Sequence, residues 1–437
     1  MRRLAILLAA AGALASPVTA RAQSQKLAFI IPDLYGPRGL IVNSEALLPD
    51  GSTHSAHFNS AFQAEFTQFN ISLASQLASV PLPSPASGFT YELDPALGVF
   101  KRSTQSFGPI LGERAETIGK HKVSLGFNYQ YFTFDTIEGV DLHDVPAVFT
   151  HDNAAPGGRA DVVTTSNDLD LKVGQFTAFL SYGLADVVDI SAAVPFVKVD
   201  LSATSMATIR RIGTASSPAT HFFADASAPG GFGTTKSFAS SGTASGIGDV
   251  IGRLKARVVR SGSTGVALGV DVRFPTGDEL DLLGSGAWGV KPFLVVSFSQ
   301  KVLSPHLNVG YQWNGESVLA GNVVTGEKKS LPDQILYEAG VDIGVTPRIT
   351  LALDVLGRRV LKSPRLQTET FHALQGGLTF PNIHFIQDAD FNQTNGAAGV
   401  KVNAGGKFLL DVNVLFKLDN AGLRDKVTPL VGFEYSF

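Results

Sequence analysis

The chain has 437 residues, no cysteine and a formal net charge of −3 at pH 7. This mild charge, with no basic tail, argues against nucleic acid as a partner, and the lack of cysteine excludes a disulfide framework. Abundant glycine and phenylalanine, with no later apolar stretch of spanning length, leave two exported classes: a secreted all-β protein and an outer-membrane barrel.

Residues 1–22 have the pattern of a secretory signal peptide. Arg2 and Arg3 precede a short apolar run, and Ala20-Arg21-Ala22 offers a small-x-small cleavage site. The run is shorter than the roughly 20 apolar residues that a spanning helix needs. We therefore expect the leader to be cleaved during export.

Residues 23–120 form an N-terminal segment of different character. Apolar residues of NSAFQAEFTQFNISLASQLASVP recur at spacings of three and four, which predicts an amphipathic helix at about 59–79. SGFTYELDPALGVFKRST predicts a small hairpin with its turn at Asp94-Pro95. The helix either packs under a barrel or plugs its lumen, and the hairpin either lies in the lumen or adds two strands.

Residues 121–437 alternate between apolar and polar side chains, about ten residues at a time. Period two over this length is typical of a tilted strand that crosses a bilayer. Two runs change phase, at Gly174–Gln175 and near Phe196 beside Pro195. We expect a bulge at the first and a bulge or a strand edge at the second. Twelve runs are centred near residues 129, 176, 196, 253, 270, 295, 309, 338, 354, 399, 412 and 432.

The connections between these runs alternate in length. Short turns such as Thr346-Pro347 alternate with long loops at roughly 138–167, 205–245, 276–287, 316–331, 361–394 and 417–426. Outer-membrane barrels place short turns in the periplasm and long loops outside. Since lipid offers no partners to free backbone groups, the sheet must close on itself. We predict an all-β fold, a transmembrane antiparallel β-barrel of about 12 strands, or 14 if the hairpin joins it.

The chain ends in LVGFEYSF, whose apolar side chains share one parity. We expect this last strand to pair with the first and to show its aromatic rings to lipid at the periplasmic interface. Phe433, Tyr435 and Phe437 are the candidate C-terminal signal for the barrel-assembly machinery.

The polar parity of the strands is expected to line the lumen. It either braces the interior through salt bridges or forms a charged constriction or a docking surface for the plug. Charge on the lipid side would cost roughly 2–4 kcal/mol at mid-membrane, which favours the inward assignment. The candidates are Asp249, Arg253, Lys255, Arg257, Asp271, Arg273, Glu338, Asp342, Asp354, Asp411 and Glu434.

Two further charged clusters lie outside the strands. Glu113, Arg114 and Glu116 either pin the plug to the wall or form a solvated turn. Asp278, Glu279 and Asp281 are either a divalent-ion site or ordinary exposed acids.

Catalytic residues, cofactors and metal sites are not expected. His143, His151 and His221 lie in predicted loops without a meaningful Ser/His/acid order, and no metal-ligand spacing appears.

Several stretches resemble the outer-membrane transporters filed under the meta-pathway of phenol degradation, relatives of long-chain fatty-acid and aromatic-hydrocarbon channels. They are SFGPILGERAETIGKHKVSLGFNYQYFTFD (106–135), YGLADVVDISAAVPF (182–196), SGIGDVIGRLKAR (245–257), RFPTGDELDLLGSGAWGVKPFL (273–294), NVGYQWNG (308–315) and GLRDKVTPLVGFEYSF (422–437). The resemblance covers roughly residues 85–437. This chain lacks the Asn-Pro-Ala triplet that the fatty-acid channels carry near their mature N-terminus.

The resemblance implies a channel, not an enzyme, in the outer membrane of a Gram-negative-type bacterium. Its function would be passive uptake of small hydrophobic or aromatic compounds, with lipid and a small hydrophobic solute as partners. Two alternatives stay open: a structural barrel whose loops contact partners, and a hydrolase with its active site at the rim.

Overall fold

The structure, a computed structural model, describes residues 26–35, 43–44, 72–73, 91–94, 99–102, 106–149, 161–210, 221–224, 232–300, 302–373 and 377–437. The predicted signal peptide lies outside these residues, and so does the predicted helix at 59–79 except for Ser72 and Leu73.

No helix within the described residues is long and apolar enough to cross a membrane.

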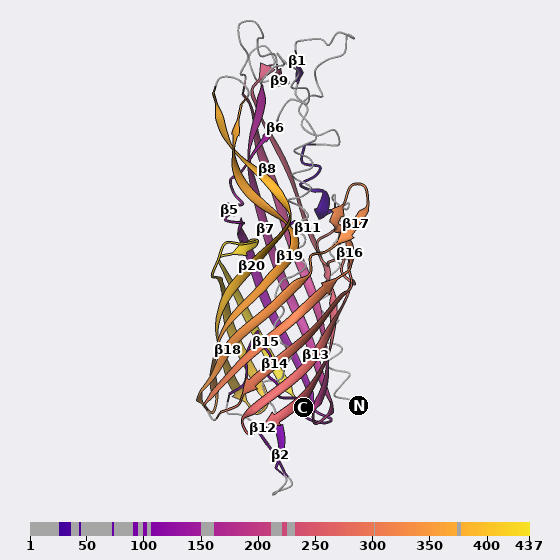
Figure 1. The fold of residues 1–437 in the computed structure, drawn as a ribbon, viewed down its shortest axis with the longest axis vertical. Coiled ribbons are helices and arrows are strands. Elements are labelled where there is room, and N and C mark those ends of the chain that lie inside the picture. The colour runs from indigo at the N-terminus through magenta and orange to yellow at the C-terminus, as the bar shows by residue number, and fades with distance from the viewer. Residues whose placement is uncertain are drawn as a thin grey trace.

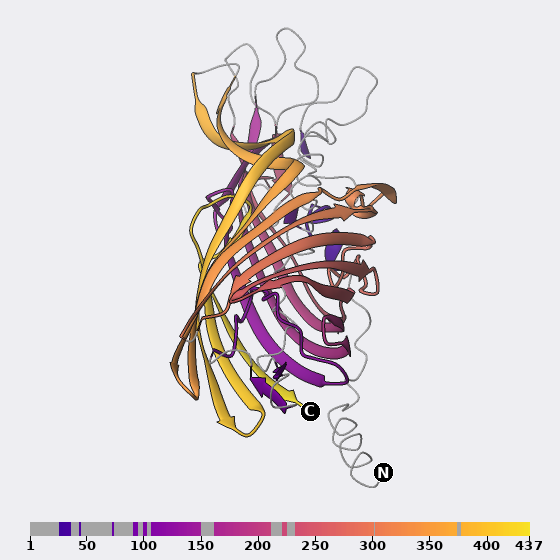
Figure 2. The ribbon, with the colours of Figure 1, turned by 60° about the horizontal axis from the view of Figure 1, so that its bottom comes forward.

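Twelve antiparallel strands close into a barrel, as predicted (Figures 1 and 2). The ring closes where the last strand pairs with the first, with Val431 opposite Tyr129 and Phe433 opposite Phe127. In ring order the strands are β4 (Val123–Ile137), β7 (Val162–Ala185), β8 (Val188–Arg210), β12 (Val250–Ser261), β13 (Thr264–Phe274), β14 (Gly289–Phe298), β15 (Leu303–Asn314), β18 (Gln334–Thr346), β19 (Ile349–His372), β20 (Thr379–Gly405), β21 (Phe408–Lys417) and β23 (Val427–Ser436).

The remaining strands and a short helix are not part of the twelve-strand ring. β2 (Tyr91–Asp94) and β3 (Val99–Arg102) pair with each other and lie outside the main sheet, so the barrel has twelve strands and not fourteen. The other short elements are η2 (Leu27–Phe29), β1 (Asn43–Ser44), β5 (Val140–Asp141), β6 (Val145–Phe149), β9 (His221–Ala224), β10 (Phe232–Gly233), β11 (Thr235–Ile247), β16 (Glu316–Asn322), β17 (Glu327–Ser330) and β22 (Leu423–Asp425).

The predicted long loops are partly strands. β7, β8, β19 and β20 have 23 to 27 residues and rise far beyond the end of the shorter strands (Figure 1). β11 adds to this extension by pairing with the upper half of β8. About ten residues suffice to cross a bilayer. The upper halves of these strands therefore form a wall that stands in water.

The bulge predicted at Gly174–Gln175 is wrong. Near Phe196 the structure has a strand edge, the second of the two alternatives: on one side of β8 the pairing passes from β11, which ends opposite Phe196, to β12, which begins opposite Ala193. β7 and β8 pair without a break across Gly174 and Phe196. Up to Phe176 and Phe196, the outward-facing residues are apolar, and these two rings have exposed fractions of 42% and 50%. Further along the wall the apolar residues point inward, and Val173 and Val199 have exposed fractions of 2% and 1%. The apolar parity changes face because the surroundings of the wall change from lipid to water, and the backbone stays regular.

The same change occurs in the first strand. Tyr129 points outward and Phe132 inward, and Tyr129 is paired with Phe176, which in turn is paired with Phe196. These three rings form one outward-facing row where the wall leaves the apolar belt, a position that aromatic rings favour. The row thus marks the outer boundary of the bilayer on this side of the barrel.

Candidate functional site

Residues 106–119, which we call the floor segment, cross the barrel lumen from one wall to the other. Near one end, the backbone N–H of Phe107 donates to Thr350 Oγ1 on β19 at 2.9 Å. Near the other, the N–H of Ile118 donates to Asp189 Oδ2 on β8 at 3.1 Å. β19 and β8 lie on opposite sides of the twelve-strand ring. Both contacts are near short turns, which places the floor segment at the periplasmic end.

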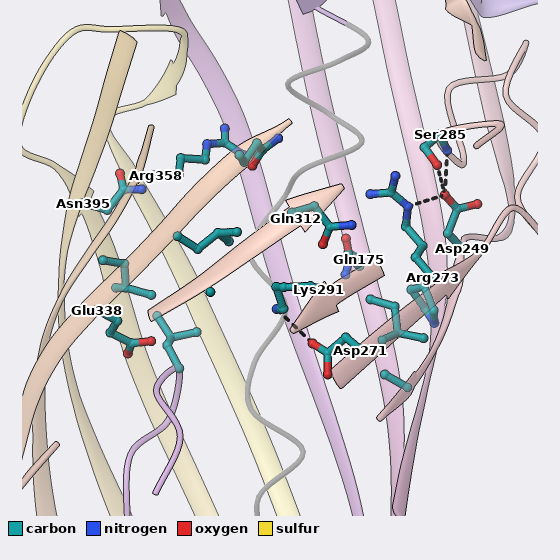
Figure 3. A pocket seen from close by; sticks show the side chains of 18 of the residues that line it. Gln175, Asp249, Asp271, Arg273, Ser285, Lys291, Gln312, Glu338, Arg358 and Asn395 are labelled. Carbon is teal, nitrogen blue, oxygen red and sulfur yellow. Dashed lines mark hydrogen bonds and ion pairs between the residues drawn. The ribbon is translucent and has the colours of Figure 1, made fainter. Parts of the chain in front are cut away.

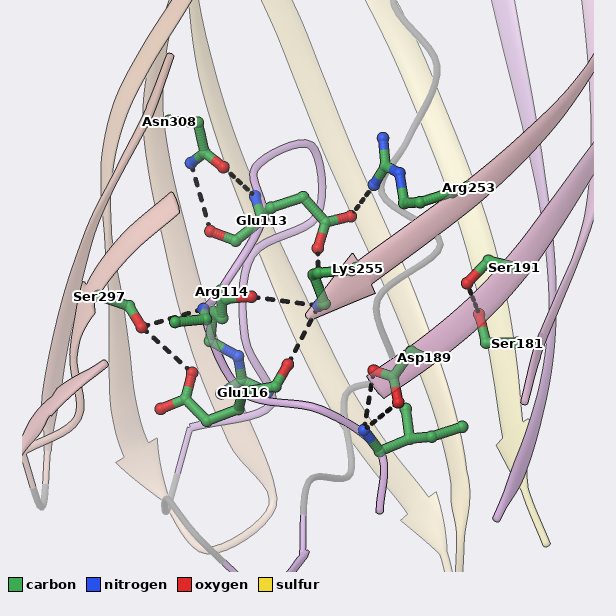
Figure 4. A network of polar contacts seen from close by, with 12 residues as sticks. Glu113, Arg114, Glu116, Ser181, Asp189, Ser191, Arg253, Lys255, Ser297 and Asn308 are labelled. Atoms are coloured by element: carbon green, nitrogen blue, oxygen red, sulfur yellow. Dashed lines mark hydrogen bonds and ion pairs between the residues drawn. The ribbon is translucent and has the colours of Figure 1, made fainter. Parts of the chain in front are cut away.

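Glu113 joins the floor segment to two parts of the wall (Figure 4). Its carboxylate accepts hydrogen bonds from Arg253 and, at 3.2 Å, from Lys255 Nζ, both on β12. Its backbone N–H and carbonyl each bond the side chain of Asn308 on β15 at 3.2 Å. The side chain is buried. Glu113 thus forms ion pairs with the wall, and its role in pinning a plug stays a prediction.

Arg114 and Glu116 are buried on the same segment (Figure 4). Lys255 Nζ donates to their backbone carbonyls at 3.1 and 3.0 Å, and Ser297 Oγ donates to Glu116 Oε2 at 3.2 Å. Gly108 has a left-handed φ of +76°, and a Cβ there would lie 2.6 Å from the Arg114 guanidinium. The segment is therefore tightly fitted to the wall and is no solvated turn.

A cavity of about 330 Å³ lies above the floor segment (Figure 3). Leu111 and Glu113 form its base, and Leu282 and Leu283 from the loop after β13 line it as well. Phe132, Phe134, Val173, Phe179 and Val197 provide apolar surface. We call this space the chamber. A cavity of about 150 Å³ already accommodates benzene, so the chamber has room for a one-ring compound with substituents.

Charged side chains on β12, β13 and β14 make the rest of the chamber polar. Arg253 donates twice to Asp271, at 2.6 and 2.7 Å, and Lys291 Nζ lies 2.9 Å from the same carboxylate. Paired in this way, the charges stay hydrogen-bonded in a half-buried site. The chamber thus offers both apolar surface and hydrogen-bonding groups to a small molecule.

Asp249 and Arg273 hold the loop that covers the chamber. Asp249 accepts the backbone N–H groups of Gly277 and Ser285, at 3.1 and 2.8 Å. Arg273 Nε lies 3.7 Å from Asp249 and its Nη2 donates to Asn314 at 2.8 Å. These two candidates thus line the chamber, and Asp249 bonds the loop that contributes Leu282 and Leu283.

The basic candidates on β12 have different partners. Arg253 and Lys255 meet at Glu113, whereas Arg257 donates to the carbonyl of Asp186 at 3.4 Å, at a short turn. Among the acids, Glu434 on β23 accepts from Ser124 on β4 at 3.0 Å, which braces the seam between the last and first strands. Asp411 lies one strand further along, where a Cβ on Gly432 would touch it.

Residues 26–35 pack inside the upper barrel. Leu27, Ile30 and Ile31 share a buried cluster with inward-facing residues of β7 and β8. The Tyr35 hydroxyl donates to Asn167 Oδ1 at 3.1 Å and lies 2.7 Å from Ser205 Oγ. Burial raises the pKa of this hydroxyl above its usual value. We call residues 26–35 the upper segment.

Lys26 ties the upper segment to the loop over the chamber. Its Nζ lies 2.7 Å from Asp278 and 2.6 Å from Asp281. These bonds raise the pKa of Lys26. Burial alone would raise the pKa of Asp278, but the bond to Lys26 outweighs it and holds that pKa below its usual value. A lysine ammonium thus occupies the acidic cluster for which a divalent ion was one of two interpretations.

The histidines flagged in the sequence give no support to catalysis. His143 lies 2.7 Å from Asp168 on the outer surface, which raises the pKa of His143. His151 lies outside the described residues, and the side chain of His221 is not described. Sequence reasoning missed His306, which is buried on β15 among carboxylates of β18 and β19. No spacing along the chain points to it, because its neighbours come from other strands.

A comparison with known protein families gave a match. Residues 150–328 match the family described as "Putative MetA-pathway of phenol degradation", which confirms the resemblance found in the sequence. No curated protein matches the chain.

Three solved structures are similar to the chain at low sequence identity. The COG4313 outer membrane channel from Pseudomonas putida F1 is 15% identical, with 75% of this chain and 99% of that chain covered and a TM-score of 0.42. The P. putida toluene transporter TodX is 9% identical, with 72% and 89% covered and a TM-score of 0.32. A Pseudomonas aeruginosa FadL homologue is 11% identical, with 73% and 89% covered and a TM-score of 0.30.

The closed ring and its apolar outer belt establish the location of this chain. A closed antiparallel barrel with lipid-facing apolar side chains is an outer-membrane architecture. The chain is an outer-membrane β-barrel.

Proposed function

We propose that this outer-membrane barrel is a channel for the passive uptake of small hydrophobic or aromatic compounds. The observation that carries the proposal is the chamber of about 330 Å³, enclosed by a sealed wall and lined by both phenyl rings and charged groups. Passage through it needs no energy source beyond the concentration gradient of the solute.

The chamber suits a ring that carries a polar substituent. Phe132, Phe134 and Leu283 offer the apolar surface, and each Å² of apolar surface removed from water contributes about 25 cal/mol. Lys291 and Gln312 stand on the polar side. The Lys291 ammonium can donate to a hydroxyl or carboxylate group, and the Gln312 side-chain oxygen can accept from a hydroxyl, because its Nε2 already donates to Trp313 and Asn314. Phenols and aromatic acids combine both features.

We further propose that residues 23–120 act as a plug with two closures. The upper segment would close the outer entrance, and the floor segment the periplasmic exit. The floor segment crosses the lumen from wall to wall, and in this proposal solute transfer to the periplasm requires it to move. Its polar contacts with the wall, centred on Glu113 and Lys255, are the bonds that such a movement would break.

The proposed partners follow from the outer surface. Lipid would contact the apolar belt. Phe433, Tyr435 and Phe437 point outward at the C-terminal end, with exposed fractions of 40%, 42% and 57%, which leaves them accessible to the barrel-assembly machinery before insertion.

The test is the initial uptake of a radiolabelled phenol by cells that lack the gene, with and without a plasmid-borne copy. A Leu283→Asp variant places a charge in the chamber, and a Ser202→Asp variant places one on the outer surface of the upper wall as a control. We expect uptake to rise with the wild-type and S202D chains and to stay at background with L283D. Equal uptake in all strains, with the barrel folded in the membrane, would favour the structural barrel instead.

A further inference from the structure

Four ionisable side chains meet on the inner wall beside the floor segment. His306 comes from β15, Glu338 and Asp342 from β18, and Asp354 from β19. Gly340 is paired with both His306 and Asp354. A Cβ on Gly340 would lie 2.0 Å from Asp354 Oδ1 and 2.5 Å from His306 Nε2. Only glycine at this position lets the two side chains approach to 3.0 Å.

Several oxygen atoms of this cluster have no hydrogen-bond partner among the described residues. Both carboxylate oxygens of Asp342, Oδ2 of Asp354 and Oε1 of Glu338 are buried in this state. Asp342 has no exposed surface at all. Arg114 and Lys401 act on Asp342 through space, without a hydrogen bond. Burying a carboxylate without a partner is costly, and coordination to a cation is one way to compensate it.

The atoms of the cluster are arranged as a first and a second coordination shell. One ligand atom each of His306, Glu338 and Asp354 lie within 4.8 Å of one another. A tetrahedral ion with bonds of about 2.0 Å holds its ligand atoms roughly 3.3 Å apart, so small shifts suffice. The other ring nitrogen of His306, Nδ1, faces Asp342 Oδ2 at 3.8 Å. Within the part of the chain that the structure describes, Nδ1 has no hydrogen-bond partner at this distance. A shift of about 1 Å would let it donate to Asp342, the arrangement by which carboxylates commonly orient histidine ligands.

The floor segment covers the cluster with a glycine. A Cβ on Gly112 would lie 2.5 Å from Glu338 Oε1 and 2.6 Å from His306 Nε2. The backbone of the floor segment therefore rests directly on two of the three ligand side chains.

We propose that His306 Nε2, Glu338 and Asp354 bind a divalent transition-metal ion, with zinc as the best match to one imidazole and two carboxylates. Asp342 is a positioning residue that orients the His306 ring. The ion compensates the buried carboxylates and stiffens the wall on which Gly112 rests, so its binding favours the closed floor segment. The site does not depend on which solute the chamber accepts.

The experiment is a Co²⁺ titration of the purified full chain in detergent after removal of metal with a chelator. We expect one Co²⁺ per barrel, with visible d–d absorption that Zn²⁺ abolishes by competition. D342N should weaken binding about 10- to 100-fold, as is usual for a residue that orients a ligand. H306Q and D354N should lose the spectrum.

A matched control and a folding check make the result decisive. H143Q removes a histidine that also pairs with an aspartate, at 2.7 Å but on the outer surface, and should bind Co²⁺ like the wild type. Heat-modifiable migration in gels shows which variants are folded barrels. If H306Q or D354N is not folded, E338Q takes its place as the variant that lacks a ligand. Absence of stoichiometric Co²⁺ uptake by the wild type, or unchanged affinity in folded H306Q and D354N, would overturn the proposal.

Discussion

Replacing Glu113 with glutamine tests the floor segment as a gate. The substitution keeps the size of the side chain but removes the charge that faces Arg253 and Lys255. Both partners are largely buried, with side-chain exposed fractions of 13% and 5%. The closed state loses an ion pair that the open state does not have, so the equilibrium shifts toward opening.

The size of the shift in the equilibrium depends on the hydrogen bonds that Arg253 and Lys255 keep after the substitution. Breaking a buried pair by removing one partner costs about 3–5 kcal/mol. Arg253 keeps its two bonds to Asp271, and Lys255 keeps the carbonyls of Arg114 and Glu116. We therefore place the cost below that range, at about 2–3 kcal/mol. Since 1.4 kcal/mol is a factor of ten, the open population should rise roughly 30- to 150-fold.

The assay is single-channel recording in planar bilayers, read as the fraction of time spent open. Glu434→Gln is the matched control, because it neutralises another lumen-side carboxylate, one that accepts a hydrogen bond from Ser124 at the seam of the wall. E113Q should open far more often than the wild type, and E434Q should not. An E113Q barrel that is folded and opens no more often than the wild type would refute the gate.

Three further outcomes are expected. Tyr35→Phe removes the hydroxyl bonds to β7 and β8. Amide hydrogen exchange in residues 26–35 should become faster, by the equivalent of about 1–3 kcal/mol. Unchanged exchange would show that these bonds do not hold the upper segment. Leu353→Arg places a charge on the apolar belt and should lower the free energy of unfolding by about 2–4 kcal/mol, measured by urea titration of the barrel in vesicles. Ser202→Arg on the upper wall should change it by no more than about 0.5 kcal/mol. Equal losses of stability would contradict the assigned bilayer boundary. Protection of residues 26–35 should also depend on pH, because Asp278 has a lowered pKa and Lys26 a raised one. The Asp278 contribution is present above its unfolded pKa of about 4 and is lost as pH falls further, and the Lys26 contribution is lost as pH rises past about 10.4; protection that is constant from pH 3 to pH 11 would exclude the clamp.

The strands could be predicted because alternation is a local signal. Each run from Val123 to Phe437 records which side of the wall its residues face, and all twelve runs became barrel strands. The phase change at Gly174 was misread as a bulge for the same reason. A sequence shows that the apolar parity switches but not that water replaces lipid outside the wall.

The candidate site was predictable only in part. The charges of Glu113 and Arg114 stood out beside the first strand, but their partners on β12 and β15 follow from the closure of the ring. His306 and Asp354 are 48 residues apart and meet because Gly340 separates them in register. Such a meeting depends on the pairing of three strands, which no motif spacing encodes.

The most direct measurement is uptake through a barrel whose floor segment is locked to the wall. The chain has no cysteine, so Ala115→Cys with Gly265→Cys introduces a single pair. A Cβ on Gly265 would lie 3.0 Å from that of Ala115, and a shift of about half an ångström reaches the disulfide range of 3.5–4.5 Å. We predict that the oxidised variant takes up radiolabelled phenol at the background rate and that a reductant restores uptake. Uptake at the wild-type rate by the oxidised, cross-linked barrel would show that the solute does not pass the floor segment.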